Sequence, residues 1–235
     1  MANKAFAATK TRHTRLANSP RRSQQPLLAL LAGGDRRSIG RANQVAAAVL
    51  QSPRLFSELI QGLWSTDSLV RMRAADAVEK ISRQKPDLLR RYKRELLGLL
   101  RETAMTQLGR PRAELRCNRS GRIGSQGTTQ AVWSEGTKSD EKEMRWHLAL
   151  LAARLPLNAK ERAIAIAALK NYLKDRSSIV RTFALQALAD LAEQAPDLLP
   201  EVIELLHEAV RAGTAAMRAR SRKLLLRLER QESRE

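Results

Sequence analysis

The sequence predicts an all-α fold: an α-solenoid of about five antiparallel helix pairs with a long inserted loop. Three observations support this prediction. Hydrophobic residues make up 43% of the 235 residues but aromatic residues only 3%, so the core must be built mainly from Leu, Ala, Val and Ile, which favours helices over sheets. One 22-residue segment occurs twice. Arginines that open helical patterns recur near the period of a two-helix repeat.

The duplicated segment is the strongest of these signals. Residues 68–89 and 178–199 lie 110 residues apart, and ten of their 22 positions are identical. The identical pairs are Ser68/Ser178, Val70/Val180, Arg71/Arg181, Ala74/Ala184, Ala77/Ala187, Gln84/Gln194, Pro86/Pro196, Asp87/Asp197, Leu88/Leu198 and Leu89/Leu199. The apolar positions that recur at helical spacing are Ala74, Ala77, Val78 and Ile81 in one copy and Ala184, Ala187, Leu188 and Leu191 in the other. A helix pair with such an apolar stripe buries it by stacking on the next pair.

Weaker copies follow the same frame, each opened by an arginine after an apolar residue or glycine. These arginines are Arg41, Arg71, Arg145, Arg181 and Arg218, at spacings of 30, 74, 36 and 37 residues. Residues 106–139 account for the long interval, because they hold five of the eleven glycines and show no sustained apolar period. We therefore expect residues 106–139 to be a Gly/Arg-rich loop inserted between the two helices of one pair.

The elements follow in order along the chain. The expected pairs are 26–32 with 36–51, 53–64 with 68–83, 86–105 with 140–155, 159–174 with 178–194, and 196–212 with 215–230. A basic flexible tail (1–25) precedes this repeat domain (26–230), and a short tail (231–235) follows it.

Helix start and stop signals support these boundaries. Pro86 and Pro196 suit a first helical turn, where no backbone N–H is needed. Asn158 and Asp140 each precede a glutamate by three residues, the spacing of a capping box. Gly213 fits a helix end, and Gly33-Gly34 separates the first two helices.

These residues resemble HEAT repeats, in which the second helix of each pair opens with an aspartate and, a few residues later, Val-Arg. Asp175 and Val180-Arg181 match this spacing, and Asp35 with Arg41 matches it in part. The interval from Asp67 to Arg71 is two residues shorter, and the fifth pair lacks the aspartate. The resemblance covers residues 26–230 apart from the insertion. It implies a HEAT-like architecture but little about activity, since such solenoids serve many partners.

The resemblance also implies roles for the recurring arginines. In HEAT proteins the matching arginine usually pairs with a repeat aspartate and ties adjacent repeats together. The residues given this inter-repeat structural role are Asp67, Arg71, Arg145, Asp175 and Arg181, with Asp140 and Arg218 as further members. Direct contact of these arginines with a ligand is the alternative.

The charge of the chain, +19 at pH 7, is concentrated in four segments. Residues 1–34 carry +6, 83–101 carry +5, 106–139 carry +4 and 211–235 carry +5, so the remainder is nearly neutral. Such clusters fit phosphate contacts, although an Arg-rich solvated surface has the same composition. The candidate macromolecule-binding residues are Arg90, Arg91, Lys93, Arg94, Arg218, Arg220, Arg222 and Lys223.

No catalytic, cofactor-binding or metal-binding motif is present in the sequence. The single cysteine, Cys117, excludes an intramolecular disulfide and a cysteine-cluster metal site. His13, His147 and His207 are dispersed. The longest apolar runs have about seven residues, far fewer than the roughly 20 that span a bilayer. We therefore expect no cofactor, no metal, no small-molecule substrate and no membrane partner.

The sequence predicts a cytoplasmic protein. A mitochondrial location is the alternative, because residues 1–34 contain six Lys or Arg and no acidic residue.

The expected function is that of a non-enzymatic scaffold or adaptor that binds a macromolecular partner, a protein first, on its curved helical surface. The alternative is a nucleic-acid-binding protein that contacts the phosphate backbone through its basic helices, tail and loop. A HEAT-like DNA glycosylase is a third, enzymatic hypothesis.

Overall fold

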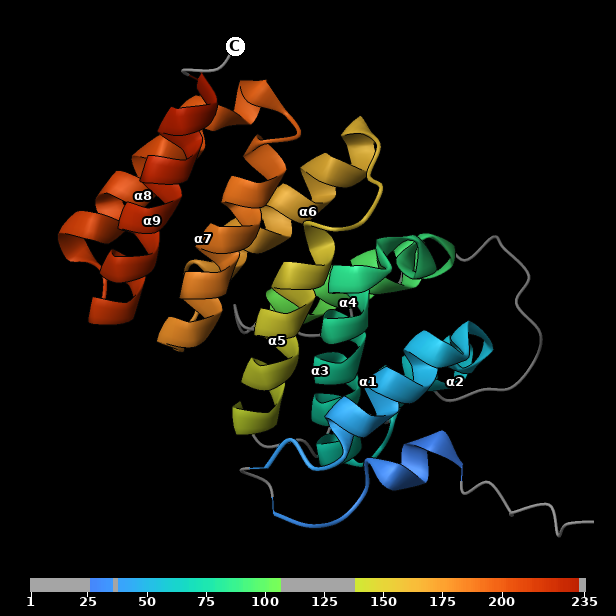
Figure 1. The fold of residues 1–235 in the computed structure, drawn as a ribbon. Coiled ribbons are helices and arrows are strands. Elements are labelled where there is room, and N and C mark those ends of the chain that lie inside the picture. Colours follow the sequence, from blue (N-terminus) through green and yellow to red (C-terminus); the bar gives the residue numbers. More distant parts are fainter. Residues whose placement is uncertain (1–25, 36–37, 107–137, 233–235) are drawn as a thin grey trace, which may run out of the picture.

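The structure, a computed structural model, describes residues 26–35, 38–106 and 138–232. Within these ranges every regular element is a helix, as Figure 1 shows. The predicted all-α class is therefore confirmed. The predicted tail (1–25) and most of the predicted insertion lie outside the described residues.

The first pair is shorter than predicted. It consists of a 3₁₀ helix, η1 (Leu27–Leu30), and α1 (Ala42–Gln51). The expected start of the second helix at residue 36 is wrong, because Gly40 has a φ of 52°, a left-handed conformation that cannot be part of an α-helix.

Arg73, which lies in the helix Ser68–Gln84 of the second pair, holds the loop between η1 and α1. Its guanidinium donates to the backbone carbonyls of Leu31, Gly33, Asp35 and Ser38 over 2.6 to 3.2 Å. A Cβ on Gly40 would lie only 2.6 Å from Arg73 Cζ. Glycine is thus required at position 40 both by its φ and by the close guanidinium.

The second pair begins with three short elements, η2 (Pro53–Leu55), α2 (Phe56–Gln61) and η3 (Gly62–Trp64). Its second helix is α3 (Ser68–Gln84), which Asp67 caps by accepting the Leu69 N–H at 2.8 Å.

The third pair starts as η4 (Pro86–Tyr92) and continues as α4 (Lys93–Thr106). Its second helix is α5 (Lys138–Ala152). The predicted capping box at Asp140 is therefore wrong, because this residue lies inside α5. The predicted insertion (106–139) is too long at both ends, because Thr106 still belongs to α4 and α5 already begins at Lys138.

The fourth and fifth pairs follow the prediction closely. They comprise α6 (Ala159–Tyr172) with α7 (Ser178–Ala192), and η6 (Pro196–Leu198) and α8 (Leu199–Ala212) with α9 (Ala215–Glu232). The predicted capping box of Asn158 and Glu161 is present. Gly213 ends α8 as predicted, and a Cβ there would lie 2.3 Å from the Ala209 carbonyl oxygen.

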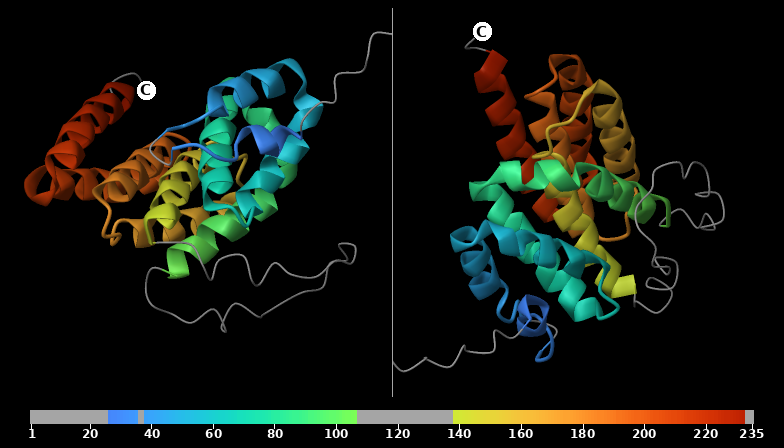
Figure 2. Two further views of the ribbon diagram at one scale, coloured as in Figure 1. Left: turned by 90° about the horizontal axis from the view of Figure 1, so that it is seen from below. Right: turned by 90° about the vertical axis from the view of Figure 1, so that its right-hand side faces the viewer.

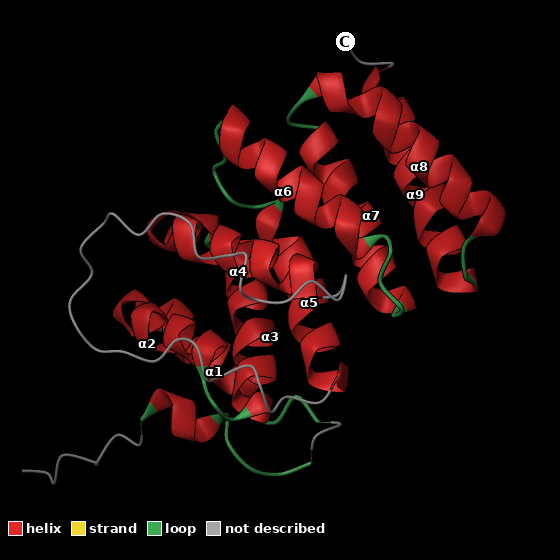
Figure 3. Ribbon diagram, turned by 180° about the vertical axis from the view of Figure 1, so that it is seen from behind, coloured by secondary structure: helices red, strands yellow, loops and turns green. Residues whose placement is uncertain are grey.

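The second helices of the pairs pack against one another in chain order. α1 contacts α3, α3 contacts α5, α5 contacts α7, and α7 contacts α9. The first helices of the later pairs pack beside them: α4 contacts α6 and α5, and α8 contacts α9 and α7. Figures 1 and 3 show this arrangement from opposite directions. Figure 2 shows the chain progressing from one end of the molecule to the other.

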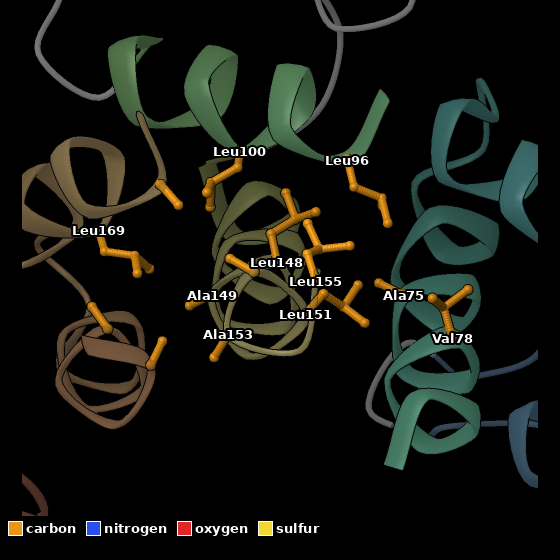
Figure 4. Packing of buried hydrophobic residues seen from close by; sticks show 14 of the residues in the cluster. Ala75, Val78, Leu96, Leu100, Leu148, Ala149, Leu151, Ala153, Leu155 and Leu169 are labelled. Carbon is orange, nitrogen blue, oxygen red and sulfur yellow. The ribbon is translucent and has the colours of Figure 1, made fainter. Parts of the chain in front are cut away.

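Small and apolar side chains fill the space between these helices. The predicted core positions Ala74, Ala77, Val78 and Ile81 and their counterparts Ala184, Ala187, Leu188 and Leu191 are all fully buried. Figure 4 shows Leu148 and Leu151 of α5 between α4 and α3, with Leu96 and Val78 pointing toward them. A buried hydrogen bond of 2.6 Å joins the hydroxyls of Thr103 in α4 and Tyr172 in α6.

Candidate functional site

Two of the recurring arginines hold the turn between the helices of their own pair. Arg71 Nη1 donates to the carbonyls of Ser65 (2.7 Å) and Thr66 (2.9 Å). In the same manner Arg218 Nη1 donates to the carbonyl of Gly213 at 2.7 Å. Each side chain thus satisfies carbonyl groups that the turn leaves outside a helix.

Arg145 makes the contact between adjacent pairs that the resemblance implies. Its Nε lies 2.7 Å from Oδ2 of Asp175, and both side chains are buried. Asp175 also accepts the backbone N–H of Ser177 through Oδ1. The ion pair therefore joins α5 to the turn that precedes α7. Arg181, at the equivalent position of α7, is partly buried.

The structure separates the predicted macromolecule-binding cations into two groups. Lys93 is bonded to Glu161 at 2.6 Å, and Arg220 donates to Gln186 at 3.0 Å. Together with Arg218, these side chains are engaged in contacts within the fold. The exposed residues are Arg90, Arg91, Arg94, Arg222 and Lys223, of which Arg90 lies 3.5 Å from Asp87.

The sequence analysis missed a series of interacting side chains that lies across α1, α3, α5, α7 and α9. We call this series the cross-helix row. Its members are Asn43, Asp76, Glu79, Lys80, Arg83, Trp146, His147, Arg154, Phe183, Gln186, Asp190, Glu193, Arg220 and Arg227.

At the α1 end of the row, Lys80 bridges Asn43 and Asp76, with 2.6 Å to each. On the other side of Asp76, Nε2 of the buried His147 lies 3.7 Å from Oδ1. Burial raises the pKa of Asp76, but the interactions with His147 and Lys80 outweigh this effect, and the pKa lies below its ordinary value. Asp76 is therefore the charged link between α3 and α5.

Aromatic rings continue the row from α5 to α9. Trp146 stacks on His147, and on its other side it stacks on Phe183 of α7, with 4.9 Å between the ring centroids. The guanidinium of Arg220 lies 5.6 Å from the Phe183 centroid, within the range of a cation–π contact. These rings contact one another and Arg220, so the stack joins three helices.

The row also contains a buried carboxylate on α3, that of Glu79. Glu79, 2% exposed, lies 2.9 Å from Arg83 Nε and 2.8 Å from Arg154 Nη2. Arg154 also donates to Ser82 Oγ and to the Glu79 carbonyl. Beside these residues is a cleft of about 500 Å³, lined by Ser82, Arg83, Pro86, Asp87, Ala153, Arg154, Leu155, Pro156 and Gln194.

Arg227 completes the row at the α9 end. Its guanidinium is 2.7 Å from Asp190 and 2.7 Å from Glu193, both on α7. Burial is the main reason that the pKa of Glu193 is raised, and the charge of Asp190 adds to it, although Arg227 lowers it. Lys223 lies one helical turn from both Arg220 and Arg227 and so belongs to the same face of α9.

A positional signal for the row exists in the sequence. The second position after four of the recurring arginines holds a row member: Asn43, His147, Phe183 and Arg220. After Arg71 this position holds Arg73, which contacts the loop between η1 and α1 instead. The ninth position after the last four recurring arginines holds Lys80, Arg154, Asp190 and Arg227. These positions lie seven residues apart, or two helical turns, and so share a face.

Neither a protein-family model nor a curated protein matches this sequence. Among the described residues, no group of three or more His, Cys, Asp or Glu side chains is placed to hold a metal ion. Within the same ranges no helix has the length and apolar character needed to cross a membrane.

Proposed function

We propose that the protein is a HEAT-like α-solenoid that binds a protein partner along the face formed by α3, α5, α7 and α9. The succession of packed second helices, with an arginine as the fourth residue of α3, α7 and α9, supports a repeat architecture. The Arg145–Asp175 ion pair between adjacent pairs supports the HEAT-like assignment in particular.

The observation that carries the proposal is the cross-helix row itself. It brings arginine, tryptophan and phenylalanine side chains from successive helices onto one face. Trp and Arg are the residue types most enriched among the side chains that dominate protein interfaces. Because ion pairs and stacked rings hold these side chains in place, a partner would immobilise few rotamers on binding.

The charge distribution within the row favours a partner with acidic side chains. In the ion pairs of Lys80, Arg83 and Arg154, the cation is more exposed than the carboxylate. Arg83 is 61% exposed against 2% for Glu79, and Lys80 is 32% exposed against 15% for Asp76. A partner therefore meets the positive ends of these pairs. Such complementarity mainly increases specificity and the rate of association.

The row is a less suitable surface for nucleic acid. Its carboxylates, Asp76, Glu79, Asp190 and Glu193, each have a cationic neighbour within the row. Binding to a phosphate backbone depends on cations that neutralise phosphates and release counterions, and paired cations provide less of that charge.

The glycosylase hypothesis requires a carboxylate beside aromatic rings, and Asp76 is the residue in that position. It faces His147, which stacks on Trp146. Because Lys80 bonds this carboxylate and His147 lies beside it, we assign it a structural role. Release of an alkylated base from duplex DNA by the wild-type protein, and its loss in Asp76→Asn, would contradict that assignment.

Site-specific photo-crosslinking tests the binding proposal. A benzophenone amino acid replaces either Arg83 or Lys223, both exposed on the row face, or the exposed Ala167 on α6 as the matched control. We expect the same acidic protein to be crosslinked from both row positions and not from Ala167. Crosslinking from Ala167 alone, or of different proteins from the two row positions, would contradict the proposal.

A further inference from the structure

Outside the row, the exposed face of α4 combines three arginines and a glycine. Arg94, Gly98 and Arg101 are all exposed, and their spacing of four and three residues places them on one side of the helix. Arg91, also exposed, lies three residues before Arg94 at the end of η4. Among the described residues, Arg91, Arg94 and Arg101 make no hydrogen bond or close ion pair, and the charge of Arg94 contributes only the smallest part of the lowering of the Glu161 pKa. These cations are therefore open to an external anion.

Gly98 is the unusual member of this face. Glycine inside a helix is unfavourable relative to alanine, and it is often kept where a side chain would collide with a neighbour. Among the described residues, no atom of another helix or loop lies within 4 Å of the place that a Cβ of Gly98 would occupy, so packing within this part of the chain does not require a glycine. A glycine on an exposed side of a helix leaves the backbone accessible to the close approach of another molecule.

We propose that this α4 face, formed by Arg91, Arg94, Gly98 and Arg101, binds the phosphate backbone of duplex nucleic acid. Arg94 and Arg101 are separated by about 10 Å along the helix axis, which equals the axial rise of about three phosphates of one strand when α4 lies parallel to the duplex axis. Gly98 lies between them and lets the sugar–phosphate chain contact the helix surface.

The neighbouring side chains favour a duplex over a single strand and limit the contact to one edge of α4. Proteins bind single strands largely by stacking bases on exposed aromatic rings, whereas Tyr92, next to Arg91, packs edge-on against Phe56. Glu95 lies three residues before Gly98 and Glu102 four residues after it, so both carboxylates border this face on the side away from Arg94 and Arg101. Lys93 is bonded to Glu161 and contributes less.

This surface is distinct from the protein-binding row, because it lies on α4 and the row lies on the second helices of the pairs. The two proposals are independent, and the α4 surface does not require a protein partner. Together they describe an adaptor that holds a nucleic acid on one side and a protein on the other.

Titration of the full chain against a fluorescently labelled DNA duplex over a series of KCl concentrations tests the proposal. The variant Arg91→Gln/Arg94→Gln/Arg101→Gln should bind more weakly, and the slope of log K against log salt should become shallower by about 3, close to one unit per lost phosphate contact. The matched control, Arg222→Gln/Arg230→Gln, removes two exposed cations of α9 that lie outside the row and should change the slope little.

Gly98→Gln separates binding from folding. Glutamine is a good helix former, so the melting temperature should rise, while affinity for the duplex should fall by about tenfold, a loss of about 1.4 kcal/mol. Three results would overturn the proposal: an unchanged salt slope in the triple variant, an equal loss in the α9 control, or tighter binding to a single strand or an acidic peptide than to the duplex. Unchanged affinity of Gly98→Gln would remove the close-contact role of this glycine.

Discussion

Arg145 and Asp175 form a buried ion pair between neighbouring helix pairs, with 2.7 Å from Nε to Oδ2 and side-chain exposures of 8% and 2%. A charge pair so far from water is costly to break from one side, because the remaining partner stays buried without compensation. This contact gives the packed helices a polar link that the apolar core alone does not provide.

Replacing Arg145 by Met should therefore lower the free energy of unfolding by about 3–5 kcal/mol, since Asp175 is left buried and unpaired. Urea denaturation followed by circular dichroism measures the change. The matched control is Arg90→Met, which breaks an exposed pair with Asp87 and should cost less than about 1 kcal/mol. Equal effects of the two substitutions would show that the buried pair has no special importance.

Arg73 has a similar role at the start of the chain. Arg73→Met leaves the carbonyls of Leu31, Gly33, Asp35 and Ser38 without their donor, and we expect a loss of about 3 kcal/mol or more. Arg41→Met, at the exposed start of α1, is the control. Protection of the Leu31 to Gly40 amides from hydrogen exchange should fall in the first variant only, and unchanged protection would contradict the assigned role.

The buried alanines limit the distance between helices. Ala77→Leu and Ala187→Leu should each destabilise the fold by about 1–3 kcal/mol, because the added atoms have no space in the core. Ala167→Leu adds the same atoms at an exposed site on α6. Thermal unfolding that is unchanged in the two buried variants would show that the stack is looser than the structure indicates.

Asp76 makes stability depend on pH at the acidic end. Its pKa in the folded protein is below the ordinary value of 3.8, so its contribution is fully present above about pH 4 and is lost as pH falls through the lowered pKa. Asp76→Asn should remove part of this loss and flatten the stability curve below pH 4. Asp87→Asn, an equal charge change at an exposed site, is the control. The prediction fails if both variants retain the wild-type curve.

Helix class and order could be predicted because the apolar pattern and the duplicated segment constrain them directly. Ala74, Ala77 and their counterparts occupy the core as their spacing predicted. The start of α1 was missed because a left-handed Gly40 and the distant Arg73 determine it. Capping-box spacing correctly predicted the start of α6 after Asn158. The same spacing at Asp140 gave a wrong start for α5, which begins two residues earlier at Lys138.

The candidate site was harder to predict because it depends on which helices become neighbours. The charge of Lys93, Arg218 and Arg220 was evident in the sequence, but their partners Glu161, Gly213 and Gln186 lie on other segments of the fold. Phe183 and Trp146 are 37 residues apart, and their stacking follows only from the packing of α5 on α7. Comparison of the second and ninth positions after each recurring arginine would have brought most of the row together.

The central claim, that the row binds an acidic protein, is tested most directly by the affinity of the crosslinked partner for two charge-reversal variants. Arg83→Glu changes the row and Arg94→Glu changes α4, with both arginines exposed in the folded chain. Calorimetric titration should show at least about a tenfold weaker affinity for Arg83→Glu, a loss of about 1.4 kcal/mol, and wild-type affinity for Arg94→Glu. Wild-type affinity of Arg83→Glu together with weakened binding by Arg94→Glu would contradict the account.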